Sequence, residues 1–330
     1  MSAMTDGKKK HMKSLANARG VIAAAAMDQR GSLQKSLAKE KGVGEKDITP
    51  AMMSEFKTLV SKVLTPHASA ILLDPEFGLP AVKARAKGCG VLLSYEETGY
   101  EQNEPGRIPR LIRGWTARQT IDAGGNAVKL LIYYHPDDDK NVNALKHAFV
   151  ERIGAECECR QIPFFLEFVG YDPKGGDEKG PSFAEHKPEV VRKSVAEFSK
   201  PHYHVDVLKI EVPFNQAYVE GSRAFKGPAV HKKSQAIDFL KRCDEAAKKP
   251  YIFLSAGVSD EVFRESLELA IESGVKWNGV LCGRATWKEG IPVYAKQGAN
   301  AFEAWLSDRG VKNITALNKL LEKAVSWEAR

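Results

Sequence analysis

The chain has 330 residues, 43% of them hydrophobic and 28% charged, which is the composition of an ordinary globular protein with ample apolar material for a core. Its net charge of +7 favours an anionic small-molecule partner over nucleic acid, because the basic residues are interspersed with acids and form no stripe with aromatic residues. Five cysteines without metal-ligand spacing, the lack of a signal-peptide pattern and the lack of an apolar run of bilayer length predict a cytoplasmic protein with reduced thiols and no membrane partner.

Eight short apolar segments with the composition of buried strands are distributed along the chain, and helical patterns lie between them. A basic leader, 1–18, precedes the first strand, and a loop or short helix, 32–42, follows it. The predicted strands are 20–26, 68–73, 90–95, 127–134, 162–171, 205–212, 251–254 and 277–282. The predicted helices are 50–64, 115–123, 143–159, 188–199, 233–248 and 259–274, and two more, 292–305 and 314–325, end the chain.

Two of the predicted loops are long and polar. The segment 172–182, rich in glycine, lysine and aspartate, follows the fifth strand. A loop of roughly fifteen residues, which contains Gly221, Gly227 and Pro228, follows the sixth. The length and composition of 172–182 are typical of a mobile lid.

Eight strands that alternate with helices, and that repeatedly end in polar residues, predict an α/β protein of the (β/α)8 TIM-barrel type. A doubly wound open sheet is the alternative, and the absence of a glycine-rich nucleotide loop after the first strand disfavours it. We expect a single domain, 1–330, with the leader 1–18 and a C-terminal helical extension, 311–330. The extension offers a subunit contact for a homo-oligomer.

The sixth strand carries a lysine, Lys209, in its middle. Because strand side chains alternate between two faces, Lys209 shares a face with Val207 and Glu211, opposite Leu208 and Ile210. Burial of that face would desolvate the ammonium group and lower its pKa. A neutral amine is what Schiff-base formation with a carbonyl substrate requires. A lysine that snorkels to the end of the strand, or that pairs with a carboxylate, is the structural alternative.

Further polar residues stand near the carboxyl ends of the predicted strands, the face at which TIM barrels carry their active sites. With Lys209 they form one candidate pocket: Asp28, Gln29, Arg30, Glu96, Lys129, Glu167, Ser255 and Arg284. Glu167 can shuttle protons beside Lys209, and Lys129 can oppose a positive charge on it. The structural alternative is that Glu167 and Lys129 only pair with each other.

The loops after the seventh and eighth strands have the features of a phosphate site. Barrel enzymes often bind phosphate there with glycine backbone N–H groups. Gly257 and Gly283 would allow a close backbone approach, Ser255 supplies a hydroxyl, and Arg284 supplies a planar cation. Each glycine taken alone is also consistent with a simple turn.

A metal is not expected. His202 and His204 have the spacing of a zinc pair, but they precede the sixth strand and so belong to the opposite, N-terminal face of the barrel. His135 lies on the correct face without an obvious ligand partner. We therefore predict no metal and no cofactor.

The chain resembles the tagatose 1,6-bisphosphate aldolase family of class I aldolases over nearly its whole length. The motifs that carry the resemblance are MDQRGSL (27–33), ILLDPEFGLPA (71–81), SYEETGY (94–100), VKLLIYY (128–134), IPFFLEF (162–168), VDVLKIEVPFNQAYVEG (205–221), YIFLSAGVS (251–259) and NGVLCGRATW (278–287). Members of the family are TIM barrels that cleave a ketohexose bisphosphate, a phosphorylated small-molecule substrate, without a metal.

The resemblance implies a role for each candidate residue. Lys209 would form the Schiff base and Glu167 would act as acid and base, with Asp28, Glu96 and Lys129 lining the reacting centre. The binders of a substrate phosphate would be Gln29, Ser255, Gly257 and Arg284. The chain departs from the family mostly in the leader and in 136–141, 172–187 and 222–233. The last two loops leave open how the second phosphate is held.

Two alternatives share the same barrel. A 6-deoxy-6-sulfofructose 1-phosphate aldolase would use the same lysine on a sulfonated sugar. A non-catalytic regulator would bind a sugar phosphate as a signal, and the presence of Lys209, Glu167 and Lys129 argues against it. The sequence leaves open the preference between tagatose and fructose bisphosphates.

Overall fold

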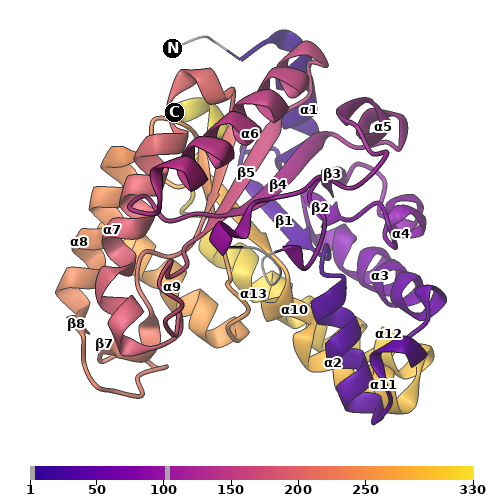
Figure 1. Ribbon diagram of the computed structural model, residues 1–330. Coiled ribbons are helices and arrows are strands. Elements are labelled where there is room, and N and C mark those ends of the chain that lie inside the picture. The colour runs from indigo at the N-terminus through magenta and orange to yellow at the C-terminus, as the bar shows by residue number, and fades with distance from the viewer. Residues whose placement is uncertain (1–3, 101–104) are drawn as a thin grey trace.

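Eight parallel strands close into a barrel in the computed structural model, which describes residues 4–100 and 105–330 (Figure 1). Around the barrel the strands follow the order β1-β10-β9-β6-β5-β4-β3-β2. They are β1 (Ile22–Ala26), β2 (Ala70–Leu73), β3 (Gly90–Ser94), β4 (Ala127–Tyr133), β5 (Phe164–Val169), β6 (Val207–Ile210), β9 (Tyr251–Leu254) and β10 (Gly279–Cys282). The predicted barrel is confirmed, and each strand lies within its predicted segment.

Helices surround the barrel and cover the outer faces of its strands (Figure 1). They are α2 (Gly31–Lys41), α3 (Pro50–Leu64), α4 (Leu79–Ala84), α5 (Ala117–Asp122), α6 (Lys140–Cys159), α7 (Pro181–Phe198), α8 (Lys233–Ala246), α9 (Asp260–Ser273) and α10 (Arg284–Trp287). The segment 32–42 is thus a helix, and α4 was not predicted. No helix in the described part of the chain is both long and apolar enough to cross a membrane.

Much of the basic leader is helical, and its residues 1–3 lie outside the described part. It forms α1 (Asp6–Leu15), whose Met12 and Leu15 are fully buried and pack with side chains from inside the barrel. Trp327 near the C-terminus belongs to the same cluster. The two ends of the chain therefore close the N-terminal end of the barrel together.

A buried ion pair fastens α1 to the barrel. Lys8 is 1% exposed, and its Nζ lies 2.8 Å from Asp206 Oδ2 and 2.6 Å from Glu158 Oε2. Lys8→Ala would leave the buried Asp206 without its partner and should lower the free energy of unfolding by about 3–5 kcal/mol. Urea denaturation followed by circular dichroism measures this loss.

Lys9→Ala on the same helix is the matched control. The side chain of Lys9 is 46% exposed, and its nearest carboxylate oxygen, on Asp6, is 3.7 Å away. We expect this change to alter the unfolding free energy by less than about 0.5 kcal/mol. Equal effects of the two substitutions would show that the ion pair does not hold α1.

The C-terminal helices differ from the prediction. The expected helix 292–305 is two helices, α11 (Ile291–Gln297) and α12 (Ala299–Trp305), because Gly298 has a φ of +85° and interrupts the helical backbone. Residues 306–310 then form a π-helical turn that leads directly into α13 (Val311–Leu321). Within the extension 311–330, α13 packs Leu317 and Leu321 into the core outside the barrel. Its use as a subunit contact stays a prediction.

The regular structure in and next to the two long loops also differs from the prediction, and the mobility of 172–182 stays a prediction. Helix α7 starts at Pro181 and not at Pro188, which shortens the loop after β5. The loop after β6 contains a small parallel ladder of β7 (Val219–Glu220) and β8 (His231–Lys232). Both loops lie at the carboxyl end of the barrel, where they border the cavity described below.

Candidate active site

Lys209 points into the barrel, as the alternation of side chains along β6 predicts. Its neighbour Val207 packs among the residues inside the barrel, whereas Leu208 and Ile210 pack against the helices. Lys209 is 4% exposed, and its Nζ lies 2.8 Å from Glu167 Oε2. The contact follows from the strand register, because Glu167 of β5 is paired with Lys209.

A second lysine, Lys129 of β4, shares the same carboxylate. Its Nζ lies 2.9 Å from Glu167 Oε2, the oxygen that also contacts Lys209. Glu167 therefore lies between two ammonium groups. The alternative in which Glu167 pairs only with Lys129 does not describe this site. That Lys129 opposes a positive charge on Lys209 stays a prediction.

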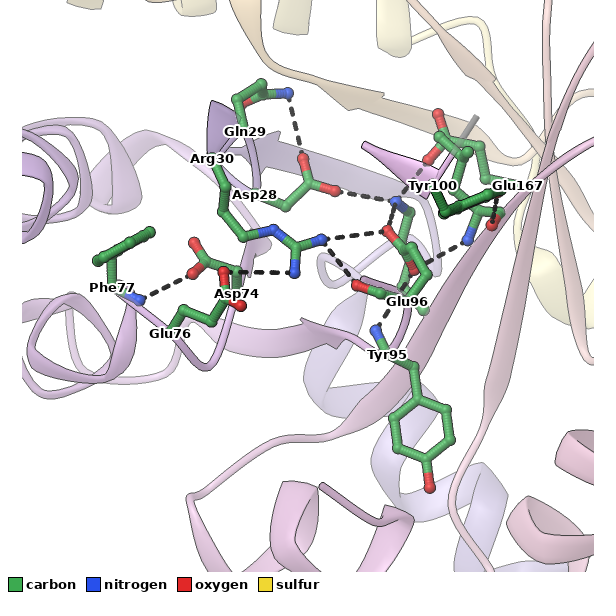
Figure 2. A network of polar contacts seen from close by, with 12 residues as sticks. Asp28, Gln29, Arg30, Asp74, Glu76, Phe77, Tyr95, Glu96, Tyr100 and Glu167 are labelled. Carbon is green, nitrogen blue, oxygen red and sulfur yellow. Dashed lines mark hydrogen bonds and ion pairs between the residues drawn. The ribbon is translucent and has the colours of Figure 1, made fainter. Parts of the chain in front are cut away.

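Three carboxylates surround Lys129, and they belong to Asp28, Glu96 and Glu167, which Figure 2 labels. Besides Glu167, Asp28 Oδ2 lies 2.9 Å and Glu96 Oε1 3.0 Å from its Nζ. Burial alone would lower the pKa of Lys129, but the negative charges of Asp28, Glu167 and Glu96 outweigh burial and hold it well above its usual value. Lys129 is thus a fixed positive charge inside the barrel.

The same charges keep two of the acids ionised. Burial would raise the pKa of Asp28 and of Glu167, but the positive charges of Lys129 and Lys209 outweigh burial and hold both values below their usual range. At neutral pH both side chains are therefore carboxylates. Glu167 can accept a proton from Lys209, which is in direct contact with it.

Figure 2 shows how residues around this cluster orient it. Gln29 Nε2 donates a hydrogen bond to Asp28 Oδ1 at 3.1 Å. Arg30 is 5% exposed, and its Nη2 donates to the backbone oxygen of Glu96 at 2.8 Å. The second oxygen of Glu96 accepts from the backbone N–H of Leu131 at 2.9 Å. Arg30 thus lies beside the carboxylate cluster and supports Glu96.

The loops after β9 and β10 meet at the position predicted for phosphate. Ala256 and Gly257 have φ values of +48° and +76°, which turn the chain sharply after Ser255. A Cβ atom on Gly257 would lie 2.7 Å from Cζ of Arg284, so the guanidinium group packs directly over this glycine. Gly283 is equally restricted, because a Cβ there would lie 2.7 Å from the backbone oxygen of Ala26.

A cavity of about 830 Å³ connects the lysine cluster with these loops. Seven of the predicted site residues line it: Gln29, Glu167, Lys209, Ser255, Gly257, Gly283 and Arg284. The other four, Asp28, Arg30, Glu96 and Lys129, are not among its lining residues and lie behind its wall, in contact with one another or with Glu167. The predicted site residues therefore lie at the cavity or next to its lining residues, and their roles stay predictions.

The prediction missed other residues along the same wall. Tyr133, Lys187 and Glu211 line the cavity, and Lys187 Nζ lies 2.9 Å from Glu211 Oε1. The period of two along a strand could have identified Tyr133, four residues after Lys129, and Glu211, two after Lys209. Lys187 belongs to α7, and no pattern in the sequence indicated that a residue of this helix would line the cavity.

The two loops expected to reach the substrate do border the cavity. Glu178 and Lys179 come from the first loop, and Ala224 and Lys226 come from the second.

Within residues 4–100 and 105–330, no three histidine, cysteine, aspartate or glutamate side chains are grouped so that they could hold a metal ion. The His202–His204 pair lies ahead of β6, at the opposite end of the barrel, as predicted.

The sequence is similar to that of known aldolases. The model of the DeoC/LacD family aldolases matches residues 22–289. The chain is 48% identical over 329 residues to the tagatose 1,6-diphosphate aldolase of Listeria monocytogenes serotype 4a (strain HCC23), covering 99% of this chain and 95% of that protein. It is also 48% identical over 320 residues to the tagatose 1,6-diphosphate aldolase of Staphylococcus aureus (strain MSSA476), covering 97% of each.

Solved structures share the fold at low sequence identity. A fructose-bisphosphate aldolase from Plasmodium falciparum matches with a TM-score of 0.69 and 14% identity, covering 96% of this chain and 95% of that one. A Schiff-base-forming fructose-1,6-bisphosphate aldolase matches with a TM-score of 0.56 and 13% identity, covering 94% of this chain and 98% of that one. These structures support the barrel architecture.

Proposed function

Because this chain belongs to the DeoC/LacD aldolase family, we propose that it is a class I aldolase that reversibly cleaves D-tagatose 1,6-bisphosphate to dihydroxyacetone phosphate and glyceraldehyde 3-phosphate. The observation that carries the proposal is the contact of both Lys209 and Lys129 with one oxygen of Glu167, beside a cavity that ends in the Ser255 and Arg284 loops. An amine beside a carboxylate is the arrangement that Schiff-base chemistry requires.

In the proposed mechanism, Lys209 passes a proton to Glu167 and its neutral Nζ attacks the C2 carbonyl of the ketose. A second proton moves from the attacking Nζ to the C2 oxygen and gives the carbinolamine. Glu167 then returns the first proton to that oxygen, which leaves as water, and an iminium forms between Lys209 and C2. The charge of Lys129 favours negative charge that develops on the C2 oxygen during the attack.

The iminium then accepts the electrons of the C3–C4 bond. As the C4 hydroxyl loses its proton to Glu167, C4 becomes the aldehyde of glyceraldehyde 3-phosphate, and C3 becomes part of an enamine on Lys209. Protonation of C3 and hydrolysis of the regenerated iminium release dihydroxyacetone phosphate and the free amine. The proton transfers assigned to Glu167 use a carboxylate in direct contact with Lys209.

Borohydride trapping tests the proposal. We would incubate the protein with dihydroxyacetone phosphate, add sodium borohydride and locate the reduced adduct by peptide mass spectrometry. An adduct on Lys209 is the expected result. An unmodified protein that still binds the ligand would favour a regulator, and an adduct on Lys129 would assign the chemistry to the other lysine.

A substrate panel tests the choice of sugar. We expect turnover of tagatose 1,6-bisphosphate that persists in the presence of a chelator. Turnover of 6-deoxy-6-sulfofructose 1-phosphate without turnover of the bisphosphate would identify the sulfosugar aldolase instead. Fructose 1,6-bisphosphate in the same panel measures the preference at C4.

We further propose that Arg284 binds the substrate phosphate beside the dihydroxyacetone end. Its side chain is exposed at the cavity, and no ion pair holds it within the described part of the chain. Loss of a charged hydrogen bond in Arg284→Gln should lower kcat/KM by about 10- to 100-fold. Arg309→Gln, on the π turn outside the cavity, is the control and should leave kcat/KM unchanged. Equal values for the Arg284 variant and the wild type would remove Arg284 from the phosphate site.

A further inference from the structure

A fully buried lysine outside the cavity contacts the segment that carries Asp28. Lys57 of α3 is 0% exposed, and its ammonium group donates three hydrogen bonds. Two go to the backbone oxygens of Met27, at 2.8 Å, and Gln29, at 2.7 Å. The third goes to the carboxylate of Asp74, which follows β2 and is also 0% exposed.

The two backbone acceptors lie on either side of Asp28. The backbone N–H of Met27 still donates to the backbone oxygen of Leu72 at 2.7 Å, but the segment has left β1, and the strand pairing of the barrel does not extend to Asp28 or Gln29. The carboxylate of Asp28 in turn contacts Lys129, which contacts Glu167. A continuous chain of contacts therefore runs from α3 to the carboxylate beside Lys209.

The chemistry of this pair argues for a role beyond packing. A buried ion pair is often no more stabilising than apolar side chains of similar volume. Burial lowers the pKa of Lys57, although Asp74 opposes this effect. An apolar residue would fill the same space without that penalty, but it could not donate hydrogen bonds to two backbone oxygens.

We propose that Lys57 is a positioning residue of the reaction, which holds the backbone on both sides of Asp28 and thereby keeps the Asp28 carboxylate against Lys129. This inference rests on the proposed function for its effect on turnover. The effect of Lys57 on Asp28 can be measured without turnover. The positioning role of Lys57 and the proposed aldolase function can therefore fail separately.

The test variant replaces the pair, Lys57→Met with Asp74→Asn. Methionine fills the space, and asparagine keeps an oxygen for the backbone N–H of Phe77, which Asp74 Oδ1 accepts at 2.8 Å. No buried charge is left unpaired, so the variant should fold, whereas Lys57→Met alone would leave Asp74 without its partner.

The pair Lys8→Met with Asp206→Asn is the matched control. Lys8 and Asp206 are also a buried lysine and aspartate, and Asp206 Oδ2 likewise accepts a backbone N–H, that of Phe164, at 2.8 Å. This pair lies at the opposite end of the barrel and should leave kcat unchanged.

We expect the Lys57 pair variant to lower kcat by about 10²-fold, the loss that a displacement of about 1 Å in an active site can cause. If Lys57 acts through Asp28, the same pair change made together with Asp28→Asn should cause a much smaller further loss. An unchanged kcat in the folded variant, an undiminished loss in the Asp28→Asn background, or an equal loss in the control pair would each overturn the proposal.

Carbon-13 NMR titration of Asp28 gives a second measurement that needs no substrate. In the Lys57 pair variant, the pKa of Asp28 should rise toward its usual range, because the carboxylate moves away from Lys129. In the Lys8 control pair, the pKa of Asp28 should equal that of the wild type. An unchanged pKa in the Lys57 pair variant would overturn the proposal whatever the activity of the protein.

Discussion

Lys209→Met is expected to lower kcat by about 10⁶-fold, the loss typical when a covalent nucleophile is removed. Methionine has nearly the length of lysine without the amine, so no iminium can form and the C3–C4 bond has no acceptor for its electrons. The variant should also give no borohydride adduct with dihydroxyacetone phosphate. The change removes a buried cation from Glu167, but Lys129 still contacts the same oxygen and limits the loss of stability.

Lys187→Met separates the reacting lysine from another lysine of the same cavity. Lys187 lines the cavity and pairs with Glu211, without a contact to Glu167 in the described part of the chain. This variant should still form the adduct on Lys209. Turnover by Lys209→Met near that of the wild type, or an adduct that persists in it, would exclude Lys209 as the Schiff-base residue.

The barrel could be predicted because the patterns that indicate it lie within short segments of the sequence. Each strand is a short apolar segment between turns, and the polar residues that end the strands mark the carboxyl face. The period of two then places Lys209 inside the barrel, together with Glu167 on the neighbouring strand β5 and Lys129 on the next strand, β4. Side-chain direction and strand order together were enough to predict that Lys209, Glu167 and Lys129 lie close together, and their roles in a reaction stay a proposal.

The missed features depend on partners far away in the sequence. Lys8 looks like part of a solvated basic leader until Asp206, 198 residues later, is placed next to it. The sequence around Lys57 did indicate its burial, because Lys57 lies on the same face of the helix as the buried Met53, Phe56 and Val60. A lysine within an apolar stripe predicts burial, but its acceptors Met27 and Asp74, which follow β1 and β2, are placed next to it only by the closed barrel.

The predicted start of α7 was wrong for a different reason. Both Pro181 and Pro188 are compatible with the first turn of a helix, and the sequence alone favours neither. In the structure Pro181 takes that position, and Pro188 lies buried in the interior of α7. The packing of α7 against the barrel outweighs the hydrogen bond that Pro188 cannot form.

Glu167→Gln is expected to lower kcat by about 10²- to 10⁴-fold, the usual contribution of a general acid and base. Glutamine keeps an oxygen for Lys129 and Lys209, so the geometry of the cluster is preserved while the proton-accepting group is lost. Glu211→Gln is the control, because Glu211 is similarly buried and lines the same cavity but contacts Lys187 and the backbone N–H of Gly170. Its kcat should stay close to that of the wild type, and equal losses in the two variants would contradict the assignment.

The pH profile gives an independent test of the same carboxylate. Burial would raise the pKa of Glu167, but the charges of Lys129 and Lys209 hold it below its usual range, so Glu167 remains ionised at every pH above the usual pKa of a glutamate side chain. Because kcat/KM reports groups of the free enzyme, Glu167 should cause no loss of kcat/KM above that pH. An acid limb near pH 6 that disappears in Glu167→Gln would contradict this prediction, because it would assign Glu167 a raised pKa and a protonated resting state.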